Sequence, residues 1–148
     1  MHKDLIQQFQ LLLNNLIEEI KAYPDEESLW AVKGDIKNAA GTLCYHLCGN
    51  LNHYIGKGMG KTGYVRNRPL EFSIRNVPKA DLIKWINETA DMIEKVVPDV
   101  DLAAPTPKEL WNRDMSNGHA LLRTLWHLGW HLGQVNYHRR IIFPDHLS

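Results

Sequence analysis

Apolar residues recur at intervals of three and four positions along four separate stretches of the chain, and this pattern constrains the fold more than any other feature. Such an interval places apolar side chains on one face of an α-helix. The four stretches span about residues 3–23, 35–55, 78–97 and 117–143. None shows the strict alternation of a half-buried strand. Four long amphipathic helices in 148 residues predict a single all-α domain, folded as a four-helix bundle.

Prolines and capping residues mark the ends of these predicted helices. Pro24 follows the first helix, Pro98 follows the third, and Pro144 is expected to end the fourth. Ser116 or Asn117 is expected to cap the start of the fourth helix. A further short turn of helix is expected around residues 109–111.

The connection between the second and third helices is long. Three glycines, Gly56, Gly58 and Gly60, are expected to end the second helix, and residues 57–77 are rich in Gly, Lys and Arg. Connections longer than about 15 residues without structure of their own are uncommon and tend to be functional. The length would let the chain return to the other end of the bundle, which predicts an up-down-down-up order of helices.

Charge and cysteine content exclude several classes of protein. The 17 basic and 17 acidic residues balance, which argues against an extended nucleic-acid-binding surface. No apolar run reaches the roughly 18–20 residues of a membrane span, and the start Met1–Leu5 lacks the pattern of a signal peptide. A cytoplasmic protein without membrane partners is therefore expected. Cys44 and Cys48, four apart on one helix, are predicted to be buried free thiols.

The fourth predicted helix carries a polar stripe between two apolar walls. At about 100° per residue the stripe contains Ala120, Thr124, His127, His131, Gln134 and His138. One wall is Leu121, Leu125, Leu128, Leu132 and Val135, and the other is Trp126, Trp130, Tyr137 and Ile141. A polar stripe with apolar walls on both sides is expected to point into the bundle, where each imidazole needs a partner.

His127 and His131 lie four residues apart, so their rings can converge on one metal ion, as HxxxH pairs do in zinc enzymes. Leu128 follows the first histidine, so the HExxH motif of metalloproteases is absent. His138 lies about 10 Å further along the helix axis and is expected to play a supporting or structural role.

The second predicted helix offers two candidates for a third ligand. His46 lies beside the apolar stripe and near the middle of the helix, which favours it. His53 lies near the glycines and remains the alternative. Three imidazoles leave a fourth position of a divalent ion open, which is typical of catalytic rather than structural sites. The alternative is that the inward histidines pair with one another without metal.

Three segments resemble the DinB-like (YfiT-like) superfamily of four-helix bundles. HLGWHLGQ over residues 127–134 is similar to its fourth-helix signature, in which HxxxH precedes a small residue and Gln. LCYHLCGNL over residues 43–51 resembles its single-histidine helix, and NRPLEF over residues 67–72 resembles the approach to its third helix in one branch.

The resemblance implies an up-down-down-up topology, a Zn or Ni ion on His46, His127 and His131, and frequent homodimers. The best-understood members of this superfamily are metal-dependent S-transferases that act on low-molecular-weight thiols, and many others have no established reaction. The expected function is therefore a metal-dependent enzyme for a small-molecule substrate, either a thiol S-transferase or a hydrolase, in which the ion activates a thiol or water. A non-catalytic helical bundle stabilised by metal is the alternative.

Other residues are assigned supporting roles. Asn50 and Gln134 are expected to orient ligands or bound water. No inward carboxylate is a convincing general base, Glu71 being the nearest candidate, so the catalytic residues are left unassigned. Basic side chains of the long connection could bind substrate carboxylates or simply be solvated: Lys57, Lys61, Arg66, Arg68 and Arg75.

The back of the fourth predicted helix carries Leu122, Gly129, Gly133 and Asn136. Two glycines four apart permit close approach of another helix. This face is expected either to form a homodimer or to pack against the first helix of the same chain.

Overall fold

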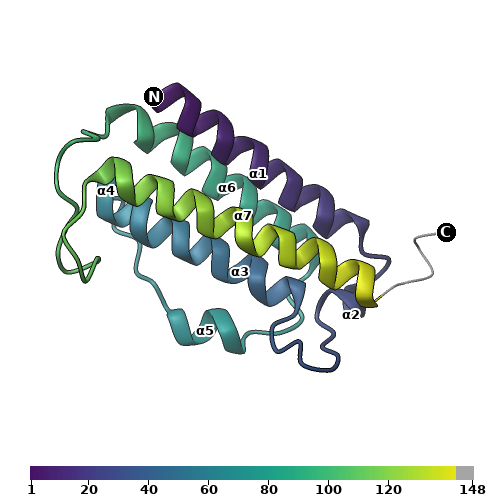
Figure 1. The fold of residues 1–148 in the computed structure, drawn as a ribbon. Helices are drawn as coiled ribbons and strands as arrows, with labels where there is room; N and C mark the ends of the chain where they lie inside the picture. The colour runs from purple at the N-terminus through teal and green to yellow at the C-terminus, as the bar shows by residue number, and fades with distance from the viewer. Residues whose placement is uncertain (143–148) are drawn as a thin grey trace.

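The computed structural model describes residues 1–142, and its regular structure is helical, with no strand in that part of the chain. The long helices are α1 (His2–Ala22), α3 (Ala40–Leu51), α6 (Lys79–Val96) and α7 (Asn117–Ile142). They lie side by side along one direction (Figure 1). The prediction of an all-α chain is confirmed for these residues. None of the described helices combines the length and apolarity that a membrane span requires.

Contacts near the helix ends define the relative directions. His2 Nε2 lies 2.7 Å from the Val100 carbonyl oxygen, so the start of α1 meets the end of α6 and the two helices run in opposite directions. Arg139, near the end of α7, donates to Glu19, near the end of α1, at 2.9 Å, so these two run in the same direction. α3 runs opposite to α7, as Figure 1 shows.

The core lies between the four helices and draws on every predicted apolar stripe. Phe9 and Leu13 of α1, Leu47 of α3 and Ile86 of α6 are fully buried. Each such side chain contributes roughly 1.5–3 kcal/mol through burial of apolar surface. Both cysteines are buried free thiols, as predicted.

The second long helix differs from its prediction at both ends. It begins at Ala40 rather than near residue 35, and it runs on through Gly56 and Gly58 before it ends directly after Gly60. It continues as the π-helix η1 (Asn52–Lys57) and the short α4 (Gly58–Gly60), and ends at Lys61, whose φ is +51°. A Cβ on Gly60 would lie 2.5 Å from Val96 Cγ2. That glycine therefore permits close packing against α6.

The connections hold short helices that the pattern did not predict. α2 (Glu26–Leu29) is capped by Asp25, whose carboxylate accepts from Ser28 N at 2.7 Å. The long connection contains α5 (Arg68–Ser73), capped by the Asn67 side chain. Where a turn of helix was expected around residues 109–111, residues 108–110 form a turn without a helix, and η2 (Val97–Asp99) extends α6.

α5 packs against α3 and so matters most for the site. Ser116 Oγ accepts from His119 N at 3.1 Å at the start of α7, in agreement with the predicted cap. Pro144, the expected end of that helix, lies outside the described residues.

Candidate metal centre

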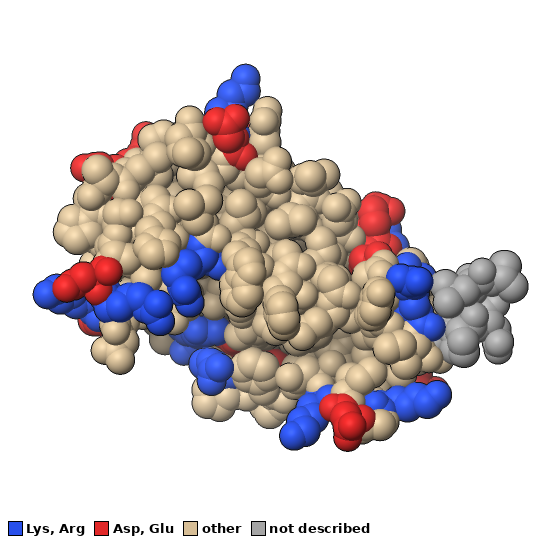
Figure 2. Space-filling view, viewed as in Figure 1, with Lys and Arg blue, Asp and Glu red and all other residues tan. Residues whose placement is uncertain are grey.

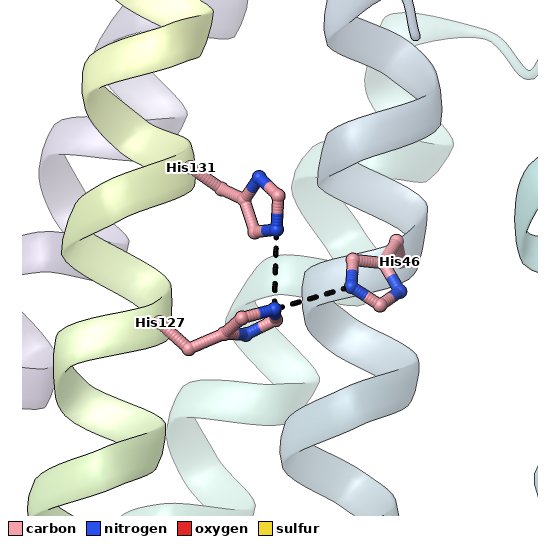
Figure 3. A group of neighbouring side chains, drawn as sticks. All are labelled: His46, His127 and His131. Atoms are coloured by element: carbon pink, nitrogen blue, oxygen red, sulfur yellow. Dashed lines mark hydrogen bonds between the residues drawn. The ribbon is translucent and has the colours of Figure 1, made fainter.

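The structure brings His46, His127 and His131 together between α3 and α7. One ring nitrogen from each histidine lies within 4.8 Å of the others. His127 Nε2 is 3.4 Å from His46 Nε2 and 3.1 Å from His131 Nε2. Figure 3 shows the three rings converging from the two facing helices. His53 lies outside the cluster, with its ring centroid 4.8 Å from that of Tyr54.

Two of the three rings are held by oxygen acceptors on their outer side. His46 Nδ1 lies 2.9 Å from Glu71 Oε1, and His131 Nδ1 lies 2.7 Å from Gln134 Oε1. An oxygen acceptor requires the proton on Nδ1, so the Nε2 lone pair of both rings faces the centre of the cluster. This is the tautomer that a metal ligand needs.

The separations of the Nε2 atoms fit a common metal ion. Zn–N bonds of 2.0–2.1 Å in a tetrahedral site place two ligand nitrogens about 3.3 Å apart. The two short separations, 3.4 and 3.1 Å, lie on either side of that value. His127 Nδ1 is buried without a hydrogen-bond partner among the described residues. The three histidines therefore lie close enough together to hold a metal ion.

Burial favours the neutral form of His127 and His131 by lowering their pKa values. Burial, reinforced by the nearby His131 and His46 rings, lowers the pKa of His127 from its ordinary value to about 4. Burial also lowers the pKa of His131, although the hydrogen bond to Gln134 acts in the opposite direction. Neutral imidazole is the form that binds a metal, so these two rings are competent ligands at neutral pH.

Glu71 is the residue whose role the sequence did not reveal. It is 1% exposed, and Arg66 donates to both of its carboxylate oxygens at 2.8 and 2.9 Å. Burial acts to raise the pKa of this carboxyl, but the hydrogen bonds from His46 and Arg66 hold it below its usual value. Both oxygens of Glu71 are thereby engaged, so it orients His46 and is unsuited to act as a general base.

A glycine on α3 makes the approach of Glu71 possible. A Cβ on Gly49 would lie 2.2 Å from Glu71 Oε2 and 2.6 Å from Glu71 Cδ. No side chain larger than hydrogen fits there without displacing the carboxylate. In the sequence, the signals for this arrangement were Gly49 beside Asn50 and the lone acidic residue within the 67–72 segment that resembles the family.

The basic residues of the long connection are largely committed within the protein. Arg66 pairs with Glu71, and Arg75 donates to the carbonyl oxygens of Phe72 and Ile74. Arg68 lies over the Phe72 ring at 5.2 Å. Of the five candidates for binding substrate carboxylates, Arg66 and Arg75 are therefore already engaged.

His138 lies apart from the cluster and supports the fold. It is 3% exposed, its Nδ1 lies 2.5 Å from the Tyr23 hydroxyl, and its Nε2 lies 2.7 Å from the Ala31 carbonyl oxygen. These contacts join α7 to the segment after α1. Of the two roles expected for His138, the structural one matches its surroundings.

The second apolar wall of α7 faces solvent, so the expectation that it points inward is wrong. Its members are more than two-fifths exposed: Trp126 61%, Trp130 57%, Tyr137 63% and Ile141 46%. The polar stripe with both walls is wider than the face that α7 packs against its neighbours. The cluster of His46, His127 and His131 lies at the margin of that face, because His127 and His131 are only partly buried. Figure 2 shows that the surface over α7 carries few charged side chains along its middle.

Other predicted residues are placed as follows. Gln134 is exposed, whereas Asn50 is 8% exposed and its Oδ1 has no hydrogen-bond partner among residues 1–142. On the back of α7, Asn136 donates to Glu19 of α1 at 2.7 Å, and a Cβ on Gly129 would lie 3.8 Å from Leu12. This part of the face packs within the chain.

Comparison with known proteins adds no further constraint. No protein-family model matches the chain, and no curated protein matches it in sequence. The resemblance to the DinB-like superfamily therefore remains a prediction.

Proposed function

We propose that this chain is an up-down-down-up four-helix bundle of the DinB-like type that binds one divalent ion, zinc or nickel, through His46, His127 and His131. One observation carries the proposal. His127 Nε2 lies at separations from the Nε2 atoms of His46 and His131 that suit a common ion, while Glu71 and Gln134 hold those two rings in the required tautomer.

The proposed activity is metal-dependent transfer to or from a small thiol, with a hydrolase as the second possibility. A divalent ion held by three imidazoles keeps a position open and lowers the pKa of a thiol or water bound there. The placement of the histidines favours access, because His127 and His131 are only partly buried at the edge of α7.

The chain's own residues favour the thiol reaction over hydrolysis. Glu71 is the carboxylate that reaches the cluster, and both of its oxygens are engaged by His46 and Arg66. A water nucleophile gains from a nearby general base, whereas a thiol ionises more easily and needs less help. Glu71 and Gln134 would act by holding His46 and His131 in orientation.

Metal analysis of the purified protein tests the proposed site. We expect about one ion per chain, and loss of that ion in His127→Ala and His131→Ala. His119→Ala is a matched control, because His119 lies exposed on the same helix. Metal content that stays unchanged in both ligand variants would overturn the proposal.

Activity is tested separately by measuring metal-dependent consumption of a thiol in the presence of an electrophile. We expect turnover that disappears in His131→Ala and after chelation. A metal-replete protein that turns over no member of a panel of thiols would instead favour a metal-stabilised bundle without catalysis. The cluster links α3 and α7, so in that case metal addition should still raise the melting temperature.

A further inference from the structure

A cavity lies between the last turns of α7 and the segment that leads into α3. Its volume is about 310 Å³, and its lining includes Ile36, Leu43, Gln134, Tyr137 and Ile141. Figure 1 shows the segment before α3 beside the end of α7. An apolar cavity of about 150 Å³ can hold a benzene molecule, so this space suits a molecule of about ten to twelve heavy atoms. We call it the Gln134 pocket.

The Gln134 pocket lies about one helical turn from the histidine cluster. Gln134 follows His131 by three residues on α7, and Leu43 precedes His46 by three residues on α3. Because α3 and α7 run in opposite directions, both steps lead toward the same end of the bundle, and each covers about 4.5 Å along the helix axis. Gln134 also joins the pocket to the cluster directly, since its Oε1 lies 2.7 Å from His131 Nδ1. A molecule in the pocket therefore lies beside the site proposed for the metal ion.

The wall of the pocket favours an uncharged ligand with an apolar body. Apolar atoms form the larger part of its surface. Tyr137 and Ile141 are 63% and 46% exposed, so part of their apolar surface is open to a bound molecule. Covering such surface is favourable in water. The two charged side chains of the lining, Asp35 and Lys37, have opposite signs and are both exposed, so their formal charges cancel.

Gln134 supplies a hydrogen-bond donor on the side of the pocket that contacts the cluster. Its Oε1 is engaged by His131, whereas its NH₂ group makes no hydrogen bond to another of residues 1–142. His138 also lines the pocket, but both of its ring nitrogens are engaged, by the Tyr23 hydroxyl and the Ala31 carbonyl oxygen. An amide NH₂ group pairs with an acceptor such as a carbonyl oxygen.

We propose that the Gln134 pocket binds the electrophile of the thiol-transfer reaction, an uncharged molecule with an apolar body and a carbonyl group that accepts from Gln134. This inference rests on the proposed function, because the thiol would react at the histidine cluster. An α,β-unsaturated ketone fits the description. The thiol sulfur bonds to the β-carbon, the carbon–carbon double bond becomes a single bond, and the proton given up by the thiol ends on the α-carbon. The addition therefore needs no further reactant.

Binding is tested with 4-phenylbutan-2-one, a saturated ketone that does not add thiols, on the protein as purified. It should shift the methyl resonances of Leu43 and Ile141 in ¹³C-methyl-labelled protein. In Ile141→Ser and Tyr137→Ala, titration of the Leu43 signal should show about tenfold weaker binding, because each change removes part of the apolar wall. Leu122→Ser alters an exposed leucine of the same helix outside the pocket and should keep the wild-type affinity. No shift at either residue, or an affinity that both wall variants retain, would overturn the proposal.

Two further comparisons test the chemistry of the ligand. 3-Phenylpropanoate has nearly the shape of the ketone but carries a carboxylate, and it should bind more weakly. Gln134→Met keeps the length of the side chain without the donor, and it should weaken ketone binding about fivefold. Tighter binding of the carboxylate, or unchanged ketone binding in Gln134→Met, would contradict the proposed ligand class.

Kinetics on the metal-loaded protein test the role in the reaction, with a small thiol and 4-phenylbut-3-en-2-one as the electrophile. Tyr137→Ala should raise KM for the enone about tenfold and leave KM for the thiol unchanged, and equal effects on both would overturn the assignment. Metal content is measured on the same samples. A bound metal without ketone binding would overturn this inference alone, whereas ketone binding in a protein that holds no metal would overturn the proposed function and leave the pocket.

Discussion

Glu71 of α5 accepts a hydrogen bond from His46 Nδ1 of α3 at 2.9 Å, although the two residues lie 25 positions apart in the chain. Arg66 holds the same carboxylate from the other side at 2.8 Å. A carboxylate behind a histidine is the usual way in which proteins fix the orientation of a metal ligand. The long connection between the second and third long helices therefore serves to bring Glu71 to the cluster.

Glu71→Gln should weaken metal binding without abolishing it. The amide keeps the size of the side chain but loses the charge that holds His46 and pairs with Arg66. Changes of this kind behind a metal ligand typically cost about 10–100-fold in affinity. Titration against a competing chelator measures the effect.

Glu94→Gln provides the control, because Glu94 lies exposed on α6. It should bind metal as tightly as the unmodified chain. An affinity in Glu71→Gln equal to that of this control would show that the carboxylate does not support the ligand.

Gly49→Ala should weaken metal binding, because it displaces the Glu71 carboxylate and changes no metal ligand. The new Cβ would lie 2.2 Å from Glu71 Oε2, so the carboxylate must leave His46 Nδ1. Gly133→Ala is the matched change on α7, where nothing lies within 4 Å of the added atom. It should stabilise the chain by up to about 1 kcal/mol. Chelator titration and urea unfolding on both variants test the contrast, and similar metal affinities would contradict it.

His138→Ala should destabilise the fold while leaving metal binding intact. It removes one hydrogen bond of the Tyr23 hydroxyl and one to the Ala31 carbonyl oxygen, and leaves a cavity in a buried region. We expect a loss of about 2–4 kcal/mol in the free energy of unfolding. Metal content should stay at the wild-type level, and a parallel loss of metal would place His138 in the metal centre after all.

The metal-free protein should become less stable as the pH falls from 7 to 5. Burial places the pKa of His127 at about 4, below its ordinary value, and lowers that of His131 as well. The unfolded chain therefore binds more protons than the folded chain in this interval, so acid favours unfolding. With allowance for partial exposure of the ring, His127 should contribute on the order of 1 kcal/mol.

Urea unfolding of the metal-free protein at several pH values measures this effect. His127→Gln lacks the titrating group, so its stability should fall less steeply over the same interval. A stability that is constant or rises toward pH 5 would contradict the assignment of neutral, buried histidines.

The amphipathic stripes and the pairing of His127 with His131 could be predicted from the sequence, because both depend only on residues that lie close together in the chain. An α-helix places residues four apart on one face, whatever surrounds it. For the same reason, the core residues Phe9 and Leu47 could be predicted from periodicity alone. The prediction that the second apolar wall points into the bundle was wrong. Periodicity shows which residues share a face of a helix, but not how much of that helix its neighbours cover. Trp126 and Trp130 are exposed for that reason.

The sequence by itself determined an all-α chain and a pair of histidines that can share an ion. Only the tertiary structure decided that His46, and not His53, joins that pair, because this depends on how α3 is rotated against α7. It also placed Glu71 behind His46, and gathered Ile36, Leu43 and Gln134 around one pocket. These contacts join residues from separate elements, and the packing of whole helices sets such distances.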